Sequence, residues 1–255
     1  MPAAPGPAST SRAPAPLAGV RVIDLGQYIA GPGAAMTLAE LGASVTKIEP
    51  LGGDQARHIG LYGESMIRAY NRGKRSIALD LKSEAGRGVA LDLIAEADVV
   101  IQNLRPGAVE KLGLGPAEVR SRYPRVIYLS ISGFGRTGPS RERPGYDIAA
   151  QAESGLMSVT GEPDRLPQKV GVPIVDAAAA HLGAQAVLAA LYGRERSGQG
   201  ATVRTSLLKA DRHSRSTVRS SARWRTRWAL LQKRGSSTSA SRPTTRHKRA
   251  QCSSA

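Results

Sequence analysis

Residues 20–49 read VRVIDLGQYIAGPGAAMTLAELGASVTKIE, and this stretch decides the fold. Its two ends, residues 20–25 and 44–49, are short runs rich in Val and Ile, which predicts two β-strands. Between them Gly31, Pro32 and Gly33 break the first strand, residues 34–41 predict a helix, and Gly42 stands where helices commonly end. A strand, a helix and a second strand in this order predict a parallel βαβ unit.

The same alternation continues along the chain. We expect further strands at residues 76–80, 99–101, 126–131 and 201–206, and helices at 83–97, 106–112, 147–154 and 176–196. Residues 50–73 show no clear period and predict a loop with one helical turn. This alternation predicts an α/β fold with an open, mostly parallel sheet and flanking helices. Ligands bind such sheets at the carboxyl ends of the strands, so the site is expected in the loops after residues 25, 49, 101 and 131.

Most of the positive charge lies near the C-terminal end. The formal net charge is +16, and residues 209–255 hold +12 of it, with 13 Lys and Arg against the single acid Asp211. This segment has no apolar period, which predicts a low-complexity, disordered basic tail. Its abrupt start favours a frame-shifted or otherwise aberrant terminus. The rival interpretation is a basic tail that binds nucleic acid through its phosphates. We do not expect nucleic acid to be a partner of the main domain.

The rest of the composition restricts the class of protein. Cys252 is the single cysteine, so the sequence offers no intrachain disulfide, which fits a cytoplasmic protein. The four His residues lack the spacing of metal ligands, and we expect no metal. Residues 1–15, rich in Pro and Ala, predict a disordered leader. No stretch approaches the roughly 18 apolar residues of a membrane span, so we expect no membrane partner.

A glycine-rich loop follows the first predicted strand, and it raises the question of a dinucleotide. Gly26, Gly31 and Gly33 lie between the strand and the helix, and Glu49 ends the second strand, where an acid would bind a ribose. The spacing is not that of the dinucleotide motif, and Pro32 lies inside the loop. NAD binding is therefore disfavoured. Glycines that only turn the chain are the simpler interpretation.

A second candidate binding site, for a phosphate, follows the predicted strand at residues 99–101. Here Arg105 and Lys111 flank the start of a short helix that Pro106 opens. The free N–H groups of a helix N-terminus suit a phosphate, and the two cations add positive charge. A solvated Arg in a strand-to-helix loop is an equally good interpretation at this stage.

The third candidate is Asp176, which opens the long Ala-rich helix. An acid at a helix start is most often an N-cap. Here Val175 precedes the acid and four Ala residues follow it, so a bulky electrophile has room to approach. Carboxylates serve as covalent nucleophiles in several enzyme classes, which is the alternative interpretation.

Several segments together resemble a known family. They are residues 16–25 (PLAGVRVIDL), 30–32 (AGP), 41–49 (LGASVTKIE), 71–82 (NRGKRSIALDLK), 97–107 (ADVVIQNLRPG), 143–147 (RPGYD), 175–176 (VD) and 194–207 (RERSGQGATVRTSL). In order and spacing, residues 16–208 resemble the family III CoA-transferases, or CaiB/BaiF family, of the formyl-CoA transferase and alpha-methylacyl-CoA racemase superfamily.

The resemblance implies a fold, an activity and a set of site residues. The fold would be a Rossmann-like large domain with a smaller second domain, in a homodimer of interlocked rings. The activity would be acyl-CoA:carboxylate CoA transfer, through an aspartyl anhydride and an aspartyl-CoA thioester on Asp176. Acyl-CoA and a carboxylic acid would be substrates, with no tightly bound cofactor. The resemblance places CoA against Ile29, Ala30, Leu79, Asp80, Leu81, Lys82, Asn103, Leu104, Arg105, Lys111, Arg143, Pro144, Gly145 and Tyr146.

The resemblance also implies where the chain departs from the family. We expect residues 16–208 to be the N-terminal part of the large domain, with the small second domain missing, which leaves open whether the truncated form is active. The alternative within the superfamily is a 2-methylacyl-CoA racemase. Racemases use a His before Asp in the segment at residues 145–147, and Tyr146 stands there in this chain. A phenol, with an ordinary pKa near 10, is a poor base at neutral pH, so the transferase is favoured.

Overall fold

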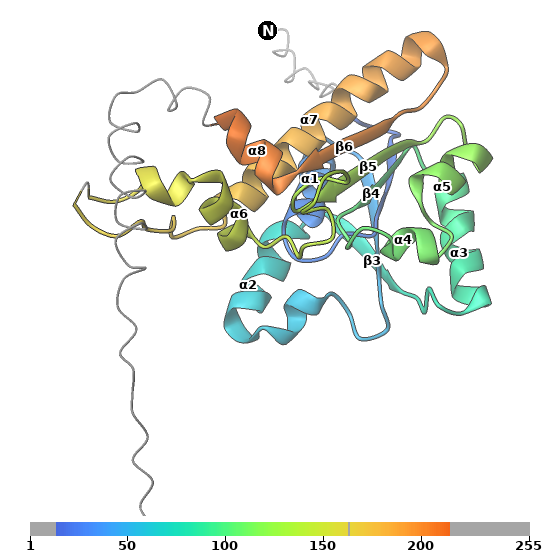
Figure 1. The fold of residues 1–255 in the computed structure, drawn as a ribbon. Helices are drawn as coiled ribbons and strands as arrows, with labels where there is room; N and C mark the ends of the chain where they lie inside the picture. The colour runs from blue at the N-terminus through green and yellow to red at the C-terminus, as the bar shows by residue number, and fades with distance from the viewer. Residues whose placement is uncertain (1–13, 163, 215–255) are drawn as a thin grey trace, which may run out of the picture.

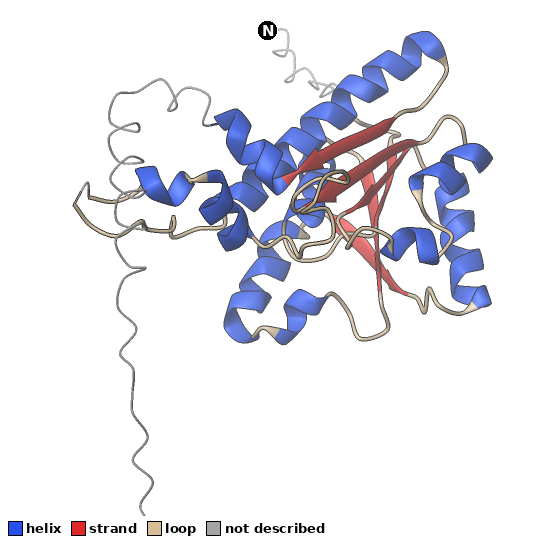
Figure 2. Cartoon of the chain, viewed as in Figure 1, coloured by secondary structure: helices blue, strands red, loops and turns tan. Residues whose placement is uncertain are grey.

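The computed structural model describes residues 14–162 and 164–214, and its centre is a parallel β-sheet covered by helices on both faces (Figures 1 and 2). The strands are β1 (Arg21–Asp24), β2 (Ser44–Glu49), β3 (Lys74–Ala78), β4 (Val99–Gln102), β5 (Ile127–Ser132) and β6 (Thr202–Ser206). All neighbouring pairs are parallel, in the order β3-β2-β1-β4-β5-β6. The predicted α/β fold with an open parallel sheet is confirmed.

The strand order places the site before any side chain is considered. The order changes direction between β1 and β4, which pair through Val22 with Val99 and Asp24 with Ile101. The connection that follows β1 leads toward one edge of the sheet, and the connection that follows β4 leads toward the other edge. A crevice therefore opens beyond their carboxyl ends, and ligands of open α/β sheets bind there.

Helices cover the two faces of the sheet. They are α1 (Ala30–Glu40), η1 (Gln55–His58), α2 (Gly60–Tyr70), α3 (Glu84–Ala95), α4 (Ala108–Lys111), α5 (Pro116–Arg122), α6 (Asp147–Ser154), η2 (Leu156–Val159), α7 (Ile174–Ser197) and α8 (Leu207–Ser214). Along β5, Ile127 and Leu129 pack toward α1 and α7, whereas Tyr128 packs toward α3 and α5. Because successive strand residues point to opposite faces, β5 is buried on both sides.

The start of α1 differs from the prediction. The helix begins at Ala30, so Gly31, Pro32 and Gly33 form its first turn instead of breaking the chain before it. Pro is tolerated there because the first helical N–H groups have no intrahelical partner. The glycines allow close packing. A Cβ on Gly31 would lie 2.8 Å from Asn103 Oδ1, and one on Gly33 would lie 3.0 Å from the Cβ of Ala180 in α7.

Residues 50–73 also differ from the prediction. They hold η1 and the eleven-residue helix α2 instead of a loop with one turn. The buried face of α2 is narrow, with Gly63 and Met66 buried. Gly63 packs so closely on the carbonyl of Ala56 that a Cβ there would lie 1.8 Å from its oxygen. Glycine at a helix contact weakens the apolar period, which is why the sequence pattern concealed this helix. The short helix α5 was not predicted either.

The C-terminal boundary falls later than residue 208. Helix α8 continues to Ser214, and its residues Ala210 and Asp211 are buried. Most of the predicted basic tail, with its proposed affinity for nucleic acid, and most of the predicted leader lie outside the described residues. Helix α7 is long and apolar enough, by length and composition, to cross a membrane. It comes closer to a membrane span than the sequence analysis expected, but here it packs on α1 and β5 and buries Ala179, Ala184 and Val187.

Candidate active site

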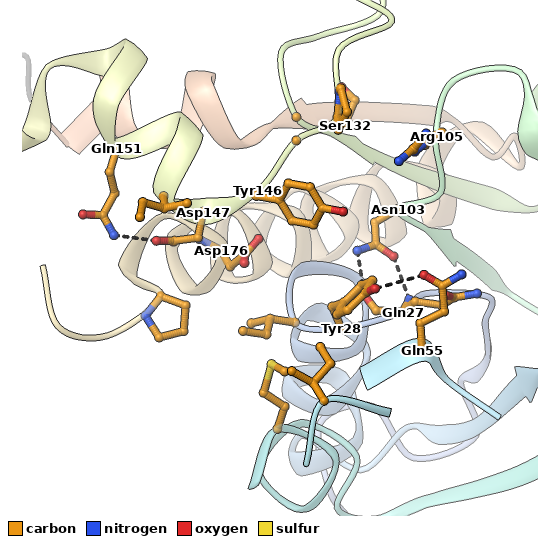
Figure 3. Close-up of a pocket in the computed structure, with 18 of the residues that line it drawn as sticks. Gln27, Tyr28, Gln55, Asn103, Arg105, Ser132, Tyr146, Asp147, Gln151 and Asp176 are labelled. Carbon is orange, nitrogen blue, oxygen red and sulfur yellow. Dashed lines mark hydrogen bonds between the residues drawn. The ribbon is translucent and has the colours of Figure 1, made fainter. Parts of the chain in front are cut away.

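A cavity of about 720 Å³ lies beyond the carboxyl ends of β1, β4 and β5, beside the N-terminal turn of α7 (Figure 3). Most of its walls come from the loops after these three strands, from η1 and α2, and from the segment before α7. Its polar lining residues include Gln27, Tyr28, Gln55, Asn103, Arg105, Ser132, Arg143, Tyr146, Asp147, Gln151, Lys169 and Asp176. The crevice expected from the strand order is thus present as a cavity in the part of the chain that the structure describes.

Asp176 is the third residue of α7, is mostly buried, and faces the cavity (Figure 3). It does not cap its own helix. Asp147 performs that function from α6, because its Oδ1 accepts hydrogen bonds from the backbone N–H of Val175 (2.8 Å) and of Asp176 (3.0 Å). Within the described part of the chain, no side chain or backbone group donates a hydrogen bond to the Asp176 carboxyl. The N-cap interpretation of Asp176 is therefore wrong.

The surroundings of Asp176 change its acidity. Burial, and after it the nearby charge of Asp147, raises the pKa of Asp176 from 3.8 to about 7. A helix N-terminus normally favours the ionised carboxylate, so the loss of hydration outweighs the dipole of α7 here. A carboxylate with this pKa is more basic than an exposed one and is about half ionised at neutral pH.

Asn103 joins the two loops at the point where the strand order changes direction. Its Oδ1 accepts from the backbone N–H of Gln27 (2.8 Å), and its Nδ2 donates to the carbonyl of the same residue (2.9 Å). These two bonds hold the loop after β1 against the loop after β4, as Figure 3 shows. Asn103 thus has its amide committed to the scaffold, and its remaining surface lines the cavity.

The next residue in the β1 loop, Tyr28, has a left-handed backbone with φ of 62°. Its N–H donates to Asp54 Oδ1 (3.1 Å), and its hydroxyl donates to Gln55 Oε1 (2.9 Å). Asp54 is fully buried and pairs with the equally buried Lys47 at 3.0 Å. Non-glycine residues adopt this conformation rarely, and where they do it is often at a functional site.

The cavity contains cations of different availability. Arg105 makes no ion pair within the described residues, and Lys169 is likewise exposed and without one there. Arg143 is already engaged, because it pairs with Glu153 at 2.7 Å and stacks over the ring of Phe134 at 4.6 Å. Arg105 and Lys169 are therefore the cations available to an anionic ligand.

The structure brings together most, but not all, of the predicted site residues. Asp176, Ile29, Asn103, Leu104, Arg105 and residues 143–146 line the one cavity. Ala30 lies directly behind it and is buried. Residues 79–82 follow β3 at the sheet edge, with Leu79 and Leu81 packed on the core and Asp80 and Lys82 exposed. Lys111 lines a separate cleft between α3, α4 and α5. The predicted contacts of residues 79–82 and of Lys111 with CoA stay predictions.

Sequence reasoning missed part of the site. Gln27, Tyr28, Asp147, Gln151 and Lys169 all line the cavity and were not named as site residues. Asp147 carried a usable signal, because an acid opens the predicted helix at residues 147–154. The conformation of Tyr28 carried none, since nothing in a sequence marks a tyrosine as left-handed.

Comparison with known proteins settles the family. The model of "CoA-transferase family III" matches residues 17–233, which is most of the chain and extends past residue 208, where the sequence analysis placed the end of the resemblance. The chain belongs to CoA-transferase family III. It is 43% identical over 204 residues to a probable fatty acyl-CoA transferase of Mycobacterium tuberculosis, covering 78% of this chain and 52% of that protein.

Two further relatives show the same coverage. Succinate–glutarate CoA-transferase of Agrobacterium fabrum is 44% identical over 204 residues, which cover 76% of this chain and 51% of the relative. The crystal structure of a CaiB/BaiF family protein from Brucella suis matches with a TM-score of 0.76 at 41% identity, over 79% of this chain and 56% of that one. The chain spans about half the length of the family III relatives that it matches.

Proposed function

We propose that the chain is an acyl-CoA:carboxylate CoA-transferase in which Asp176 carries the acyl group. The observation that supports this most directly is the Asp176 carboxyl, which lies in the cavity without a hydrogen-bond donor from residues 14–162 and 164–214. A structural carboxylate would be hydrogen-bonded, as Asp147 is. The CoA-transferase names of the relatives support the same reaction class.

The proposed reaction exchanges carboxylates on CoA without a net change in protons. An oxygen of Asp176 attacks the thioester carbonyl, the C–S bond breaks, and CoA thiolate leaves a mixed anhydride. The thiolate then attacks the aspartyl carbonyl, expels the donor acid and forms an aspartyl-CoA thioester. The acceptor carboxylate reverses both steps: it displaces thiolate from the aspartyl carbon, and the thiolate takes the new acyl group and frees Asp176. Covalent catalysis thereby divides one difficult transfer into easier steps.

The cavity offers separate surfaces for the parts of the substrates. We assign the CoA moiety to Ile29, to the loop of residues 103–105 and to residues 143–146, with Arg105 available to a phosphate. Several relatives are named for succinate, glutarate, oxalate or mesaconate, all of which are dicarboxylic acids. We propose a carboxylic acid of this class as the acceptor and assign its distal carboxylate to Lys169, which lines the cavity with Asp176.

The raised pKa of Asp176 suits the first two steps of the exchange. A more basic carboxylate is a stronger nucleophile toward the thioester and a poorer leaving group from the anhydride. The thiolate therefore more readily expels the substrate acid. Because only the ionised form attacks, the rate of acylation is expected to rise with pH through about 7.

Trapping the acyl-enzyme tests the proposal. The chain is incubated with succinyl-CoA at pH 8 and quenched with hydroxylamine, and the peptides are analysed by mass spectrometry. We expect a hydroxamate on Asp176. Asp176→Asn should abolish the label, whereas Asp92→Asn, the same exchange at an exposed position of α3, should leave it unchanged. Label that persists in Asp176→Asn, or none on the folded wild-type chain, refutes the assignment.

A further inference from the structure

Asp147 stands at the start of α6, but its side chain serves α7. Its Oδ1 accepts from the N–H groups of Val175 and Asp176, at 2.8 and 3.0 Å. Its Oδ2 accepts from Nε2 of Gln151, one turn further along α6. The Oε1 of Gln151 in turn accepts from the N–H of Val170 at 2.8 Å. The Asp147 carboxylate thus joins α6 to the first turn of α7, and through Gln151, whose bond to Asp147 is drawn in Figure 3, it also reaches the segment that leads into α7.

We propose that the Asp147 side chain is a positioning residue for Asp176, which fixes the nucleophile's helix turn through two amides and places a second negative charge beside its carboxyl. This inference rests on the proposed role of Asp176 as the nucleophile. It assigns to Asp147 no contact with the substrate.

The two carboxylates are distinguished by their partners. Asp147 accepts three hydrogen bonds, so both of its carboxylate oxygens are already engaged. Asp176 accepts none from the described residues, is mostly buried, and faces the cavity. When two nearby acids differ this way, the charge on the bonded one disfavours charge on the free one. Asp147 is therefore the fixed partner, and Asp176 is the group that titrates and reacts.

The other groups near Asp176 do not replace Asp147 in this function. Tyr70 on α2 interacts electrostatically with both acids, and their charges contribute to raising its own pKa after the larger effect of burial. Tyr28 and Tyr146 contribute phenols, and Arg105 and Lys169 are the cations in the cavity without an ion pair to a described residue. Besides burial, it is the charge of Asp147 that raises the pKa of Asp176. Removing its charge should therefore lower that pKa.

The test must separate the effect of the negative charge of Asp147 from the effect of its hydrogen bonds to the α7 amides. Asp147→Asn keeps an oxygen that accepts from both α7 amides but removes the charge. Asp147→Ser keeps a shorter capping oxygen, also without charge, and serves if the Asn variant folds poorly. The pKa of Asp176 is measured in the full chain by NMR of ¹³Cγ-labelled aspartate, with the resonance assigned from Asp176→Asn. We expect the midpoint to fall by roughly one unit in either variant. Asp92→Asn should leave it in place.

Acylation by succinyl-CoA gives the second readout. In Asp147→Asn the ascending limb of the pH–labelling profile should move down with the NMR midpoint. A midpoint unchanged in both Asp147 variants overturns the inference, because capping alone would then explain the contacts. A midpoint that moves while labelling fails in every folded chain, wild type included, supports the electrostatic inference and refutes the proposed function. If the NMR midpoint of Asp176 shifts but the ascending limb of the pH–labelling profile does not, the inference that Asp147 acts on the nucleophile is overturned.

Discussion

At the scale of single residues, Tyr28 shows how the backbone itself is specialised at this site. Its φ of 62° is the only positive value among the non-glycine residues that the structure describes. The left-handed region costs an ordinary L-residue roughly 1–2 kcal/mol, because Cβ approaches the carbonyl oxygen. The buried Asp54 and the hydroxyl contact with Gln55 hold the residue there. The neighbours of Tyr28 thus impose its conformation, which turns the loop after β1 that Asn103 holds by two hydrogen bonds.

A pair of substitutions measures this cost. Tyr28→Ala and Tyr28→Gly both delete the side chain, but only Gly tolerates positive φ without strain. We expect the Gly variant to unfold in urea with a free energy about 1 kcal/mol higher than that of the Ala variant. At Ser65, exposed in the middle of α2, the order should reverse, because Ala favours helices. Equal stability of the two Tyr28 variants would show that the strain is relieved elsewhere.

Single residues also show what sequence reasoning can and cannot reach. Asp176 and Asn103 were found because each lies at the end of a recognisable element in a family-specific order, and both line the cavity. Gln151 and Lys169 were missed because their position depends on how the segment before α7 folds back on α6, through the bond from Val170 to Gln151. Contacts between segments of irregular structure leave no period in a sequence.

At the scale of elements, a buried ion pair between β3 and β1 also binds the first turn of α1. Lys74 at the start of β3 pairs with Asp24 at the end of β1 (2.8 Å) and donates to the carbonyl of Pro32 in α1 (2.7 Å). Both charged side chains are almost completely buried, at 2% and 0% exposure. Buried pairs of this kind add little net stability, but losing one partner leaves an uncompensated charge.

Removing the cation alone should therefore cost more than removing both charges. We expect Lys74→Met to lower the free energy of unfolding by about 3 kcal/mol. Adding Asp24→Asn should recover part of this loss, because the amide still accepts from Gly26 N–H and the buried charges that remain, Lys47 and Asp54, pair with each other. Arg75→Met, at the exposed neighbouring position of β3, should change stability by less than about 0.5 kcal/mol. Additive losses in the double variant would exclude the pairing.

The elements also explain why the sheet was easier to predict than the helices. Strands such as β4 and β5 are buried on both faces and form continuous apolar runs, so their existence could be predicted directly from the sequence. Helix α2 buries little more than Gly63 and Met66, and helix α1 begins with two glycines and a proline. Those glycines are explained by contacts with Asn103 and Ala180, which are distant in sequence.

At the scale of the whole molecule, the strand order suggests a dinucleotide ligand, but the residues of the site do not suit one. The strand order is the one that binds dinucleotides in many enzymes. In those enzymes an acid at the end of the second strand binds the ribose. Here that acid, Glu49, is buried and bonded to Arg57, to Ser76 and to the N–H of Asp54. Burial on its own raises the pKa of Glu49, but these bonds outweigh it and bring the pKa to about 2.

A second feature that disfavours a dinucleotide is the side chain of Asn103, which lies in the crevice. The side chain of Asn103 bridges it by two bonds to Gln27, and Gly31 packs against that amide with no space for a ligand between them. A pyrophosphate on the first turn of α1 would have to displace this bridge. The cavity lies beside it and is lined by Arg105 and Asp176, to which the proposed function assigns a phosphate and the thioester. Function thus follows from the site and not from the shared strand order.

Ligand-linked stability distinguishes the two nucleotides. A ligand that binds only the folded chain stabilises it by about 2.7 kcal/mol at one hundred times its dissociation constant. We expect CoA to raise the unfolding temperature in proportion to the logarithm of its concentration, and NAD at equal concentration to leave it unchanged. Arg105→Met should reduce the CoA effect, because it removes one of the two cavity cations that pair with no described residue, whereas Arg75→Met should not. Stabilisation by NAD that Glu49→Gln abolishes would instead indicate a dinucleotide site at the end of β2.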